Sequence, residues 1–229
     1  RVIRMGENPK NVFDVGCPSI DLAKEILAMP TLDFDVVEKY GGTGANINTK
    51  AGYYVVLQHP VTTEFAESRA QVNSTLKVVH DLKLPTFWIW PNLDAGSDGV
   101  SKEIRGFREK FNPSGIHFFR NIPPEDFLRI LYHSKGIIGN SSVGIRECSY
   151  LGVPCVNIGS RQFGRDRGPN VIDVKPEYLE IKNAVEIELP KISRKPSFIY
   201  GDGSAGIKIA QILETVELEF EKTLRFDWK

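Results

Sequence analysis

The feature that most constrains the fold is a regular alternation of short apolar runs with longer polar or amphipathic segments. The apolar runs are rich in β-branched and aromatic residues and are bounded by breakers, a pattern typical of βαβ units. Runs without polar interruption indicate parallel strands that are buried on both faces. We therefore predict an α/β fold: a doubly wound parallel sheet of about six strands with helices on both faces. Strands are expected at residues 53–57, 86–90, 116–119, 136–139, 154–158 and 171–174.

Helices are expected between these strands, and several of their ends are marked by proline or glycine. The predicted helices cover residues 63–81, 100–111, 123–133 and 142–151, with a further one from residue 176. Residues 204–222 have the apolar spacing of a long amphipathic helix. The segment 33–50, which contains Gly-Gly-Thr-Gly at residues 41–44, lacks the strand–loop–helix setting and Gly-Lys-Ser/Thr spacing of a phosphate loop, so we interpret it as a flexible loop.

The amino-acid composition excludes several classes of protein and of binding partner. The chain is 41% apolar and 25% charged, which excludes a disordered, collagenous or coiled-coil protein. Its 29 basic residues balance 29 acidic ones, and no basic run is interleaved with aromatics, so we expect no nucleic-acid partner. No apolar run approaches the roughly 20 residues of a membrane helix, so we expect no membrane partner and a cytoplasmic location. Metal-ligand spacing and a nicotinamide fingerprint are absent, so we predict neither a metal nor a cofactor.

Polar residues recur just after the predicted strands, at the sheet edge where doubly wound domains bind ligands. Ser141 and Ser142 lie between a strand and a predicted helix, where hydroxyls and helix amides suit a phosphate or diphosphate. Simple N-capping is the alternative. Glu147, farther along the same helix, can accept two hydrogen bonds from vicinal hydroxyls, or be a solvated helix residue.

Three more polar residues follow other strands in the same way, namely His59, Asn92 and Arg161. An imidazole there can donate to a phosphate or move a proton near neutral pH, and a guanidinium can pair with phosphates. Local backbone bonding, turn formation and plain surface exposure are the respective alternatives. Because the fold brings strand ends together, the recurrence favours one shared ligand crevice.

Five motifs occur in an order that is specific as a set. They are residues 58–64 (Gln-His-Pro-Val-Thr-Thr-Glu), 91–97 (Pro-Asn-Leu-Asp-Ala-Gly-Ser), 139–147 (Gly-Asn-Ser-Ser-Val-Gly-Ile-Arg-Glu), 157–162 (Asn-Ile-Gly-Ser-Arg-Gln) and 199–203 (Ile-Tyr-Gly-Asp-Gly). Together they resemble the UDP-N-acetylglucosamine 2-epimerase family. The non-hydrolysing branch has a His-Arg-Arg-Glu-like run where this chain has His-Pro-Val-Thr at residues 59–62, which favours the hydrolysing branch.

The resemblance implies the second half of a two-domain, glycosyltransferase-B-type fold. Residues 1–21 would be a trailing helix and hinge from a missing N-terminal domain, 22–203 the UDP-binding Rossmann-like domain, and 204–229 a C-terminal helix that packs back toward the missing domain. It also implies a catalytic role for His59, the serines on phosphate, Glu147 on ribose and the backbone of Ile122 at uracil. The UDP-binding residues implied are His59, Asn92, Ile122, Ser141, Ser142, Glu147 and Arg161.

The implied activity is that of a hydrolysing UDP-N-acetylglucosamine 2-epimerase in sialic-acid-type sugar biosynthesis. UDP and the C2 proton would be eliminated to give 2-acetamidoglucal, and hydration would then give N-acetylmannosamine. The implied partners are a UDP-sugar substrate, the missing domain with its proton-transferring carboxylates, and further copies in a homo-oligomer, so we expect this chain alone to be inactive. The alternatives are the same reaction on a UDP-diacetamido-trideoxy sugar, a non-hydrolysing epimerase, a UDP-glycosyltransferase and a non-catalytic nucleotide-sugar-binding domain.

Overall fold

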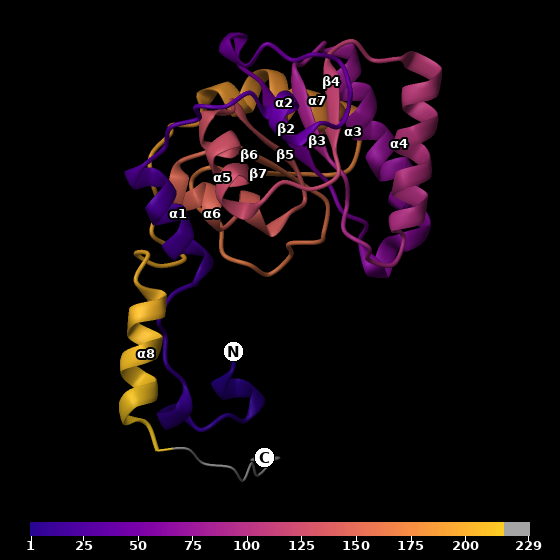
Figure 1. Cartoon of the computed structure of the whole chain (residues 1–229). Coiled ribbons are helices and arrows are strands. Elements are labelled where there is room, and N and C mark those ends of the chain that lie inside the picture. The colour runs from indigo at the N-terminus through magenta and orange to yellow at the C-terminus, as the bar shows by residue number, and fades with distance from the viewer. Residues whose placement is uncertain (218–229) are drawn as a thin grey trace.

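The structure is a computed structural model in which residues 1–217 are described. Its centre is a seven-stranded sheet of order β1-β4-β3-β2-β5-β6-β7, with helices on both faces (Figure 1). Strands β2 to β7 are parallel and lie within one residue of the expected positions, so the predicted doubly wound sheet is confirmed. They span Tyr54–Leu57 (β2), Thr86–Ile89 (β3), Ile116–Phe119 (β4), Gly136–Gly139 (β5), Cys155–Ile158 (β6) and Val171–Val174 (β7).

The seventh strand, β1, lies in the segment that we interpreted as a flexible loop. β1 (Thr43–Gly44) pairs antiparallel with β4 and places Gly44 opposite His117. A Cβ atom on Gly44 would overlap the carbonyl oxygen of Ile116, and its φ of +130° favours glycine. The glycines therefore allow a close backbone approach at the sheet edge, and that part of the loop prediction is wrong.

The helices between the strands follow the predicted order, with shorter bounds at several ends. Two helices were not predicted, Ser19–Ala28 and Val36–Tyr40, and the second lies in the segment that we interpreted as a loop. The 3₁₀ turns Ile3–Met5 and Pro9–Asn11 stand where a trailing helix was expected. The predicted helix 63–81 is divided into a 3₁₀ segment, Thr62–Glu67, which is kinked at Glu64, and α3. The predicted C-terminal helix ends at Thr215, and residues 218–222 of that prediction lie outside the described residues. The helices span Ser19–Ala28 (α1), Val36–Tyr40 (α2), Ser68–Asp81 (α3), Ser97–Phe111 (α4), Pro124–His133 (α5), Glu147–Leu151 (α6), Tyr178–Asn183 (α7) and Ala205–Thr215 (α8).

The sheet separates two apolar cores, because successive side chains of a strand point to opposite faces. In β2, Val55 packs into the core that α1, α5 and α6 cover. The next residue, Val56, packs into the core under α3, α4 and α7. Both residues are fully buried. Burial on both faces is the reason that the strands read as unbroken apolar runs.

The strand order reverses between β2 and β5, which fixes where a ligand can bind. From β2 the chain builds outward through β3 to β4, and then crosses back so that β5 lies on the other side of β2. The loops that leave β2 and β5 therefore diverge above and below the sheet and leave a crevice between them. Candidate residues after these two strands lie at that crevice.

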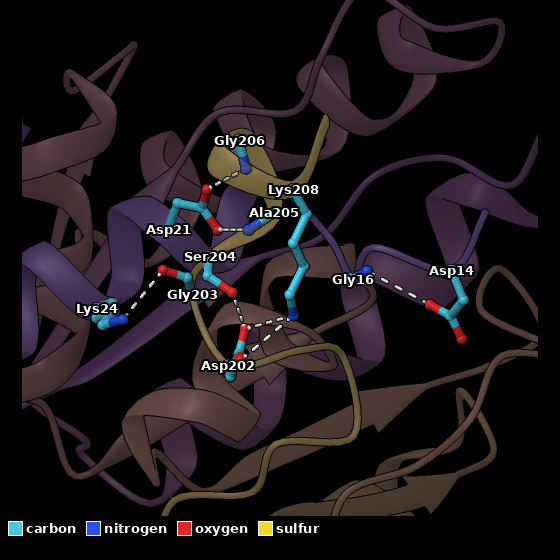
Figure 2. A network of polar contacts seen from close by, with 10 residues as sticks. All are labelled: Asp14, Gly16, Asp21, Lys24, Asp202, Gly203, Ser204, Ala205, Gly206 and Lys208. Carbon is cyan, nitrogen blue, oxygen red and sulfur yellow. Dashed lines mark hydrogen bonds and ion pairs between the residues drawn. The ribbon is translucent and has the colours of Figure 1, made fainter. Parts of the chain in front are cut away.

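The N-terminal segment and α8 meet at a polar junction beside the sheet, and both extend away from it (Figure 1). Asp21 of α1 accepts hydrogen bonds from the backbone N–H groups of Ala205 and Gly206, at 3.0 and 2.7 Å, and so caps α8 from a distant part of the chain (Figure 2). The backbone N–H of Cys17 also donates to the carbonyl of Tyr200, at 2.8 Å. Within residues 1–217, no helix has the length and apolar character needed to cross a membrane.

Candidate functional site

The loops after β2, β5 and β6 are joined by one buried residue, Asn140, through its side chain and its main-chain carbonyl. Its Oδ1 accepts from the backbone N–H of His59 at 2.7 Å, and its Nδ2 donates to the carbonyl of His59 at 2.8 Å. The carbonyl of Asn140 accepts in turn from Gln162 Nε2 at 2.8 Å and from Arg161 at 3.3 Å. Only 1% of Asn140 is exposed. Asn140 therefore bonds to both His59 and Arg161 at the strand ends.

His59 is held as a neutral hydrogen-bond donor. Its Nδ1 accepts from the backbone N–H of Asn92 at 3.1 Å, so the proton of the neutral imidazole lies on Nε2. Burial and, to a smaller extent, the nearby charge of Arg161 together lower the pKa of His59 to about 4, against a smaller opposing effect of Asp94. At neutral pH the side chain is suited to donate a hydrogen bond from Nε2, rather than to act as a cationic acid.

This lowered pKa predicts a pH dependence of stability. Between about pH 6.5 and pH 4 the unfolded chain binds a proton at His59 that the folded chain does not, so stability falls as the pH falls through that range. The full loss is roughly 3 kcal/mol. His59→Asn keeps an acceptor for Asn92 and should remove this part of the slope, as measured by urea unfolding at several pH values. Identical slopes for the two proteins would contradict the assignment.

The sequence-predicted residues line two neighbouring cavities. A cavity of about 650 Å³ is lined by four of them, together with the aromatic rings of Trp90 and Phe127. The four are His59, Asn92, Ile122 and Ser141. A second cavity, of about 610 Å³, contains Ser142 and Arg161. Ser141 and Ser142, which are adjacent in the chain, line one cavity each, so both cavities lie at the end of β5.

The second cavity carries both signs of charge. Arg161 lies 3.5 Å from Asp94, and their side chains are 26% and 37% exposed, so the pair remains open to solvent and to a ligand. Arg165 lines the same cavity. A diphosphate placed here would meet two guanidinium groups and would compete with Asp94 for Arg161.

The turn at Ser141 and Ser142 differs from the expectation. In place of one helix over residues 142–151, a 3₁₀ turn over Ser142–Gly144 precedes the short helix α6. Ser141 Oγ caps this turn at Val143, and the amides of Gly144, Ile145 and Arg146 bond to carbonyls within it. The predicted anion site made of free helix amides is therefore wrong for these groups. Gly144 explains the tight turn, since a Cβ there would lie 2.5 Å from Cys155 Sγ.

Glu147, the seventh predicted residue, lies just outside both cavities. It is the first residue of α6, it is 7% exposed, and its Oε1 lies 3.4 Å from Arg146. Arg146 also donates to Ser142 Oγ at 3.2 Å, which links Glu147 to the second cavity.

Sequence reasoning missed three residues that organise the site, namely Asn140, Asp94 and Gln162. All three lie inside the quoted motifs, so their presence was visible but their partners were not. A lone asparagine directly after a strand that ends in glycine was the available signal for Asn140, and it reads equally well as a turn residue. Within the described part of the chain, no group of three or more His, Cys, Asp or Glu side chains is arranged to hold a metal.

The open sheet and the crevice at its strand ends define a doubly wound α/β domain of the Rossmann-like class. Comparison with known families is more specific. A family model described as UDP-N-acetylglucosamine 2-epimerase matches residues 1–214. The chain belongs to the UDP-N-acetylglucosamine 2-epimerase family.

Individual relatives agree with this assignment. The chain is 31% identical over 219 residues to the hydrolysing UDP-N,N'-diacetylbacillosamine 2-epimerase of Legionella pneumophila, covering 95% of this chain and 55% of the relative. It is 31% identical over 204 residues to a UDP-N-acetylglucosamine 2-epimerase of Neisseria meningitidis, covering 88% and 51%. A crystal structure of the Methanocaldococcus jannaschii UDP-GlcNAc 2-epimerase with UDP-GlcNAc and UDP has the same fold, with a TM-score of 0.69 at 18% identity over 93% of this chain and 57% of that one. The chain spans about half the length of the curated relatives it matches.

Proposed function

We propose that this chain is the UDP-binding half of a hydrolysing UDP-N-acetylglucosamine 2-epimerase. The reaction would convert UDP-GlcNAc and water to N-acetylmannosamine and UDP through 2-acetamidoglucal. The observation that carries the proposal is the convergence of His59, Ser142 and Arg161 on the crevice where the strand order reverses. A protein with this activity belongs in the biosynthesis of sialic-acid-type sugars.

The proposed chemistry of this half is stabilisation of a leaving group. As the bond from C1 of the sugar to the diphosphate oxygen breaks, negative charge develops on UDP. The Nε2–H of His59, the Ser142 hydroxyl and the Arg161 guanidinium would each donate to that charge from fixed positions. The His59 imidazole acts here without titrating, which agrees with its pKa of about 4. The C2 proton would be removed by a carboxylate outside this chain.

Exposed apolar side chains near both ends of the described chain support packing against a further domain. Ile207 and Leu213 of α8 are 66% and 65% exposed, although the helix is apolar enough to need a partner. The N-terminal residues Ile3 and Met5 are 50% and 75% exposed. We propose that residues 1–21 and α8 pack against a further domain that closes over the crevice, and that the assembled protein is a cytoplasmic homo-oligomer.

The first test is UDP binding, measured by calorimetry on the natural full-length protein and on this chain. Arg161→Ala should weaken UDP binding by about 10- to 100-fold, because a hydrogen bond to a charged group is lost. Arg69→Ala removes the same charge from an exposed pair with Glu103 between α3 and α4, and should leave UDP affinity within about twofold. Equal losses in the two variants would contradict the assignment of the crevice.

The second test is the reaction itself. The full-length protein, supplied with UDP-GlcNAc in D₂O and without an acceptor, should release UDP and N-acetylmannosamine that carries deuterium at C2. Retention of UDP on an epimerised sugar would identify a non-hydrolysing epimerase, and a need for an acceptor would identify a glycosyltransferase. Binding of UDP without turnover would favour a non-catalytic binding domain.

A second substrate is favoured by one finding. The Legionella pneumophila relative is described as acting on UDP-N,N'-diacetylbacillosamine, and it matches nearly the whole chain. Parallel NMR assays with UDP-GlcNAc and with the UDP-diacetamido-trideoxy sugar will show which product forms. The proposal of UDP-GlcNAc as the substrate fails if only the second sugar is turned over.

A further inference from the structure

Arg146 is a side chain for which the proposed function so far has no use, and its guanidinium group makes three convergent contacts. One terminal nitrogen lies 3.2 Å from Ser142 Oγ and 3.4 Å from Glu147 Oε1, and the other lies 3.7 Å from Cys17 Sγ. These partners belong to the crevice, to α6 and to the segment before α1. Arg146 therefore ties the crevice to the N-terminal segment.

The contact between Arg146 and Glu147 requires a local break in the backbone. Neighbouring residues of an α-helix point about 100° apart, so side chains at i and i+1 do not normally face each other. Arg146 has φ −91° and ψ −76° and precedes the first residue of α6, between the 3₁₀ turn and the helix. The irregular backbone lets the guanidinium group fold toward the Glu147 carboxylate.

Glu147 has one oxygen engaged and one without a partner. Its side chain is only 10% exposed, yet Oε2 is buried and lacks a hydrogen-bond partner. Nε of Arg146 is unpartnered in the same way. A buried carboxylate oxygen in this state is costly, and a ligand donor is one explanation for it.

We propose that Arg146 is the positioning residue for Glu147, and that it fixes the carboxylate so that Oε2 accepts the hydroxyl groups of a ribose. This inference rests on the proposed function, because it takes the ligand of the crevice to be a uridine nucleotide. Arg146 acts through Glu147 and through Ser142, without touching the ribose. The planar guanidinium group of Arg146 contacts both residues at once, which the single ammonium group of a lysine cannot do.

The test compares UDP with 2′-deoxy-UDP on the natural full-length protein. The wild type should bind UDP about 10-fold or more tightly than 2′-deoxy-UDP, because hydrogen bonds to a charged acceptor depend on the ribose hydroxyls. Glu147→Gln should reduce this preference, and Arg146→Gln should reduce it by the same factor. The double variant should lose no more than either single one.

Several outcomes separate the inference from the proposed function. Retained affinity for 2′-deoxy-UDP shows that Arg146→Gln is folded, and Arg146→Lys provides a milder variant if it is not. Arg165→Gln removes a guanidinium from the same crevice and should weaken both nucleotides alike, leaving the preference unchanged. Equal weakening of both nucleotides by Arg146→Gln, or additive losses in the double variant, would overturn the positioning role. No UDP binding by the wild type would instead overturn the proposed function, and UDP binding without a ribose preference would overturn only this inference.

Discussion

Gly139→Ala should cost the protein at least about 3 kcal/mol of its free energy of unfolding, which is a large part of the roughly 5–15 kcal/mol typical of a domain. Gly139 ends β5 directly opposite Leu57 of β2. An added Cβ would overlap the carbonyl oxygen of Leu57 and press on the backbone N of Gln58 at 3.2 Å. Neither atom can move without separating two central parallel strands. The φ of Gly139, +144°, adds backbone strain for any other residue.

Two other glycines serve as matched controls for urea or thermal unfolding. Gly164 has a positive φ of +77° with open space around it, so Gly164→Ala isolates the backbone strain, about 1 kcal/mol. Gly106 lies within α4 and also has open space, so Gly106→Ala should raise stability by about 0.5–1 kcal/mol. If Gly139→Ala loses no more stability than Gly164→Ala, the close contact with Leu57 is not what requires glycine.

The second large effect is expected at Asn140. Asn140→Asp keeps the oxygen that accepts from the backbone N–H of His59 but replaces the amide donor with an oxygen that faces the carbonyl of His59. A buried acceptor loses its partner and a buried charge is introduced, so we expect a loss of about 2–4 kcal/mol. Because the Asn140 side chain holds the backbone of His59, the affinity for UDP should fall by about 10-fold or more even at temperatures where the variant is folded.

Calorimetry with UDP and urea unfolding will measure the two effects of Asn140→Asp. Asn183→Asp, at an exposed position that ends α7, is the control and should change stability by about 0.5 kcal/mol or less. A normal UDP affinity in folded Asn140→Asp would show that the hydrogen bonds between Asn140 and His59 stabilise the fold without shaping the site.

Much of the fold was predictable because its signals are local. The strand Gly136–Gly139 was identified from four adjacent apolar or small residues, and Pro123 and Pro124 placed the start of α5. Because the central strands are buried on both faces of the sheet, each is an unbroken apolar run, and the repetition of such runs along the chain predicted the doubly wound sheet. The division of the chain at residues 21 and 203 is untested by these features and stays a prediction.

The position of the candidate residues at the strand ends was predictable, and the backbone geometry around Ser142 was not. Residues that follow parallel strands meet at one edge of the sheet, so His59, Ser142 and Arg161 could be assigned to that edge from their positions in the sequence. The short 3₁₀ turn after Ser141 was not visible, because it depends on how closely Gly144 packs against Cys155 on the next strand. The amides of Gly144, Ile145 and Arg146 bond to carbonyls within that turn.

The sequence by itself determined the order of the parallel strands and of the helices between them, the family and the set of candidate residues, since periodicity, breakers and motifs are properties of neighbouring residues. Only the tertiary structure decided which hydrogen-bond partners hold those residues, and in which protonation state His59 is held. The Asn140 side chain hydrogen-bonds to His59, which is 81 residues away in the sequence. Burial and the charge of Arg161 lower the pKa of His59 and keep its imidazole neutral. Asp21 caps α8 from 184 residues away. Desolvation and hydrogen bonding between distant segments exist only after the chain has folded, so no local pattern records them.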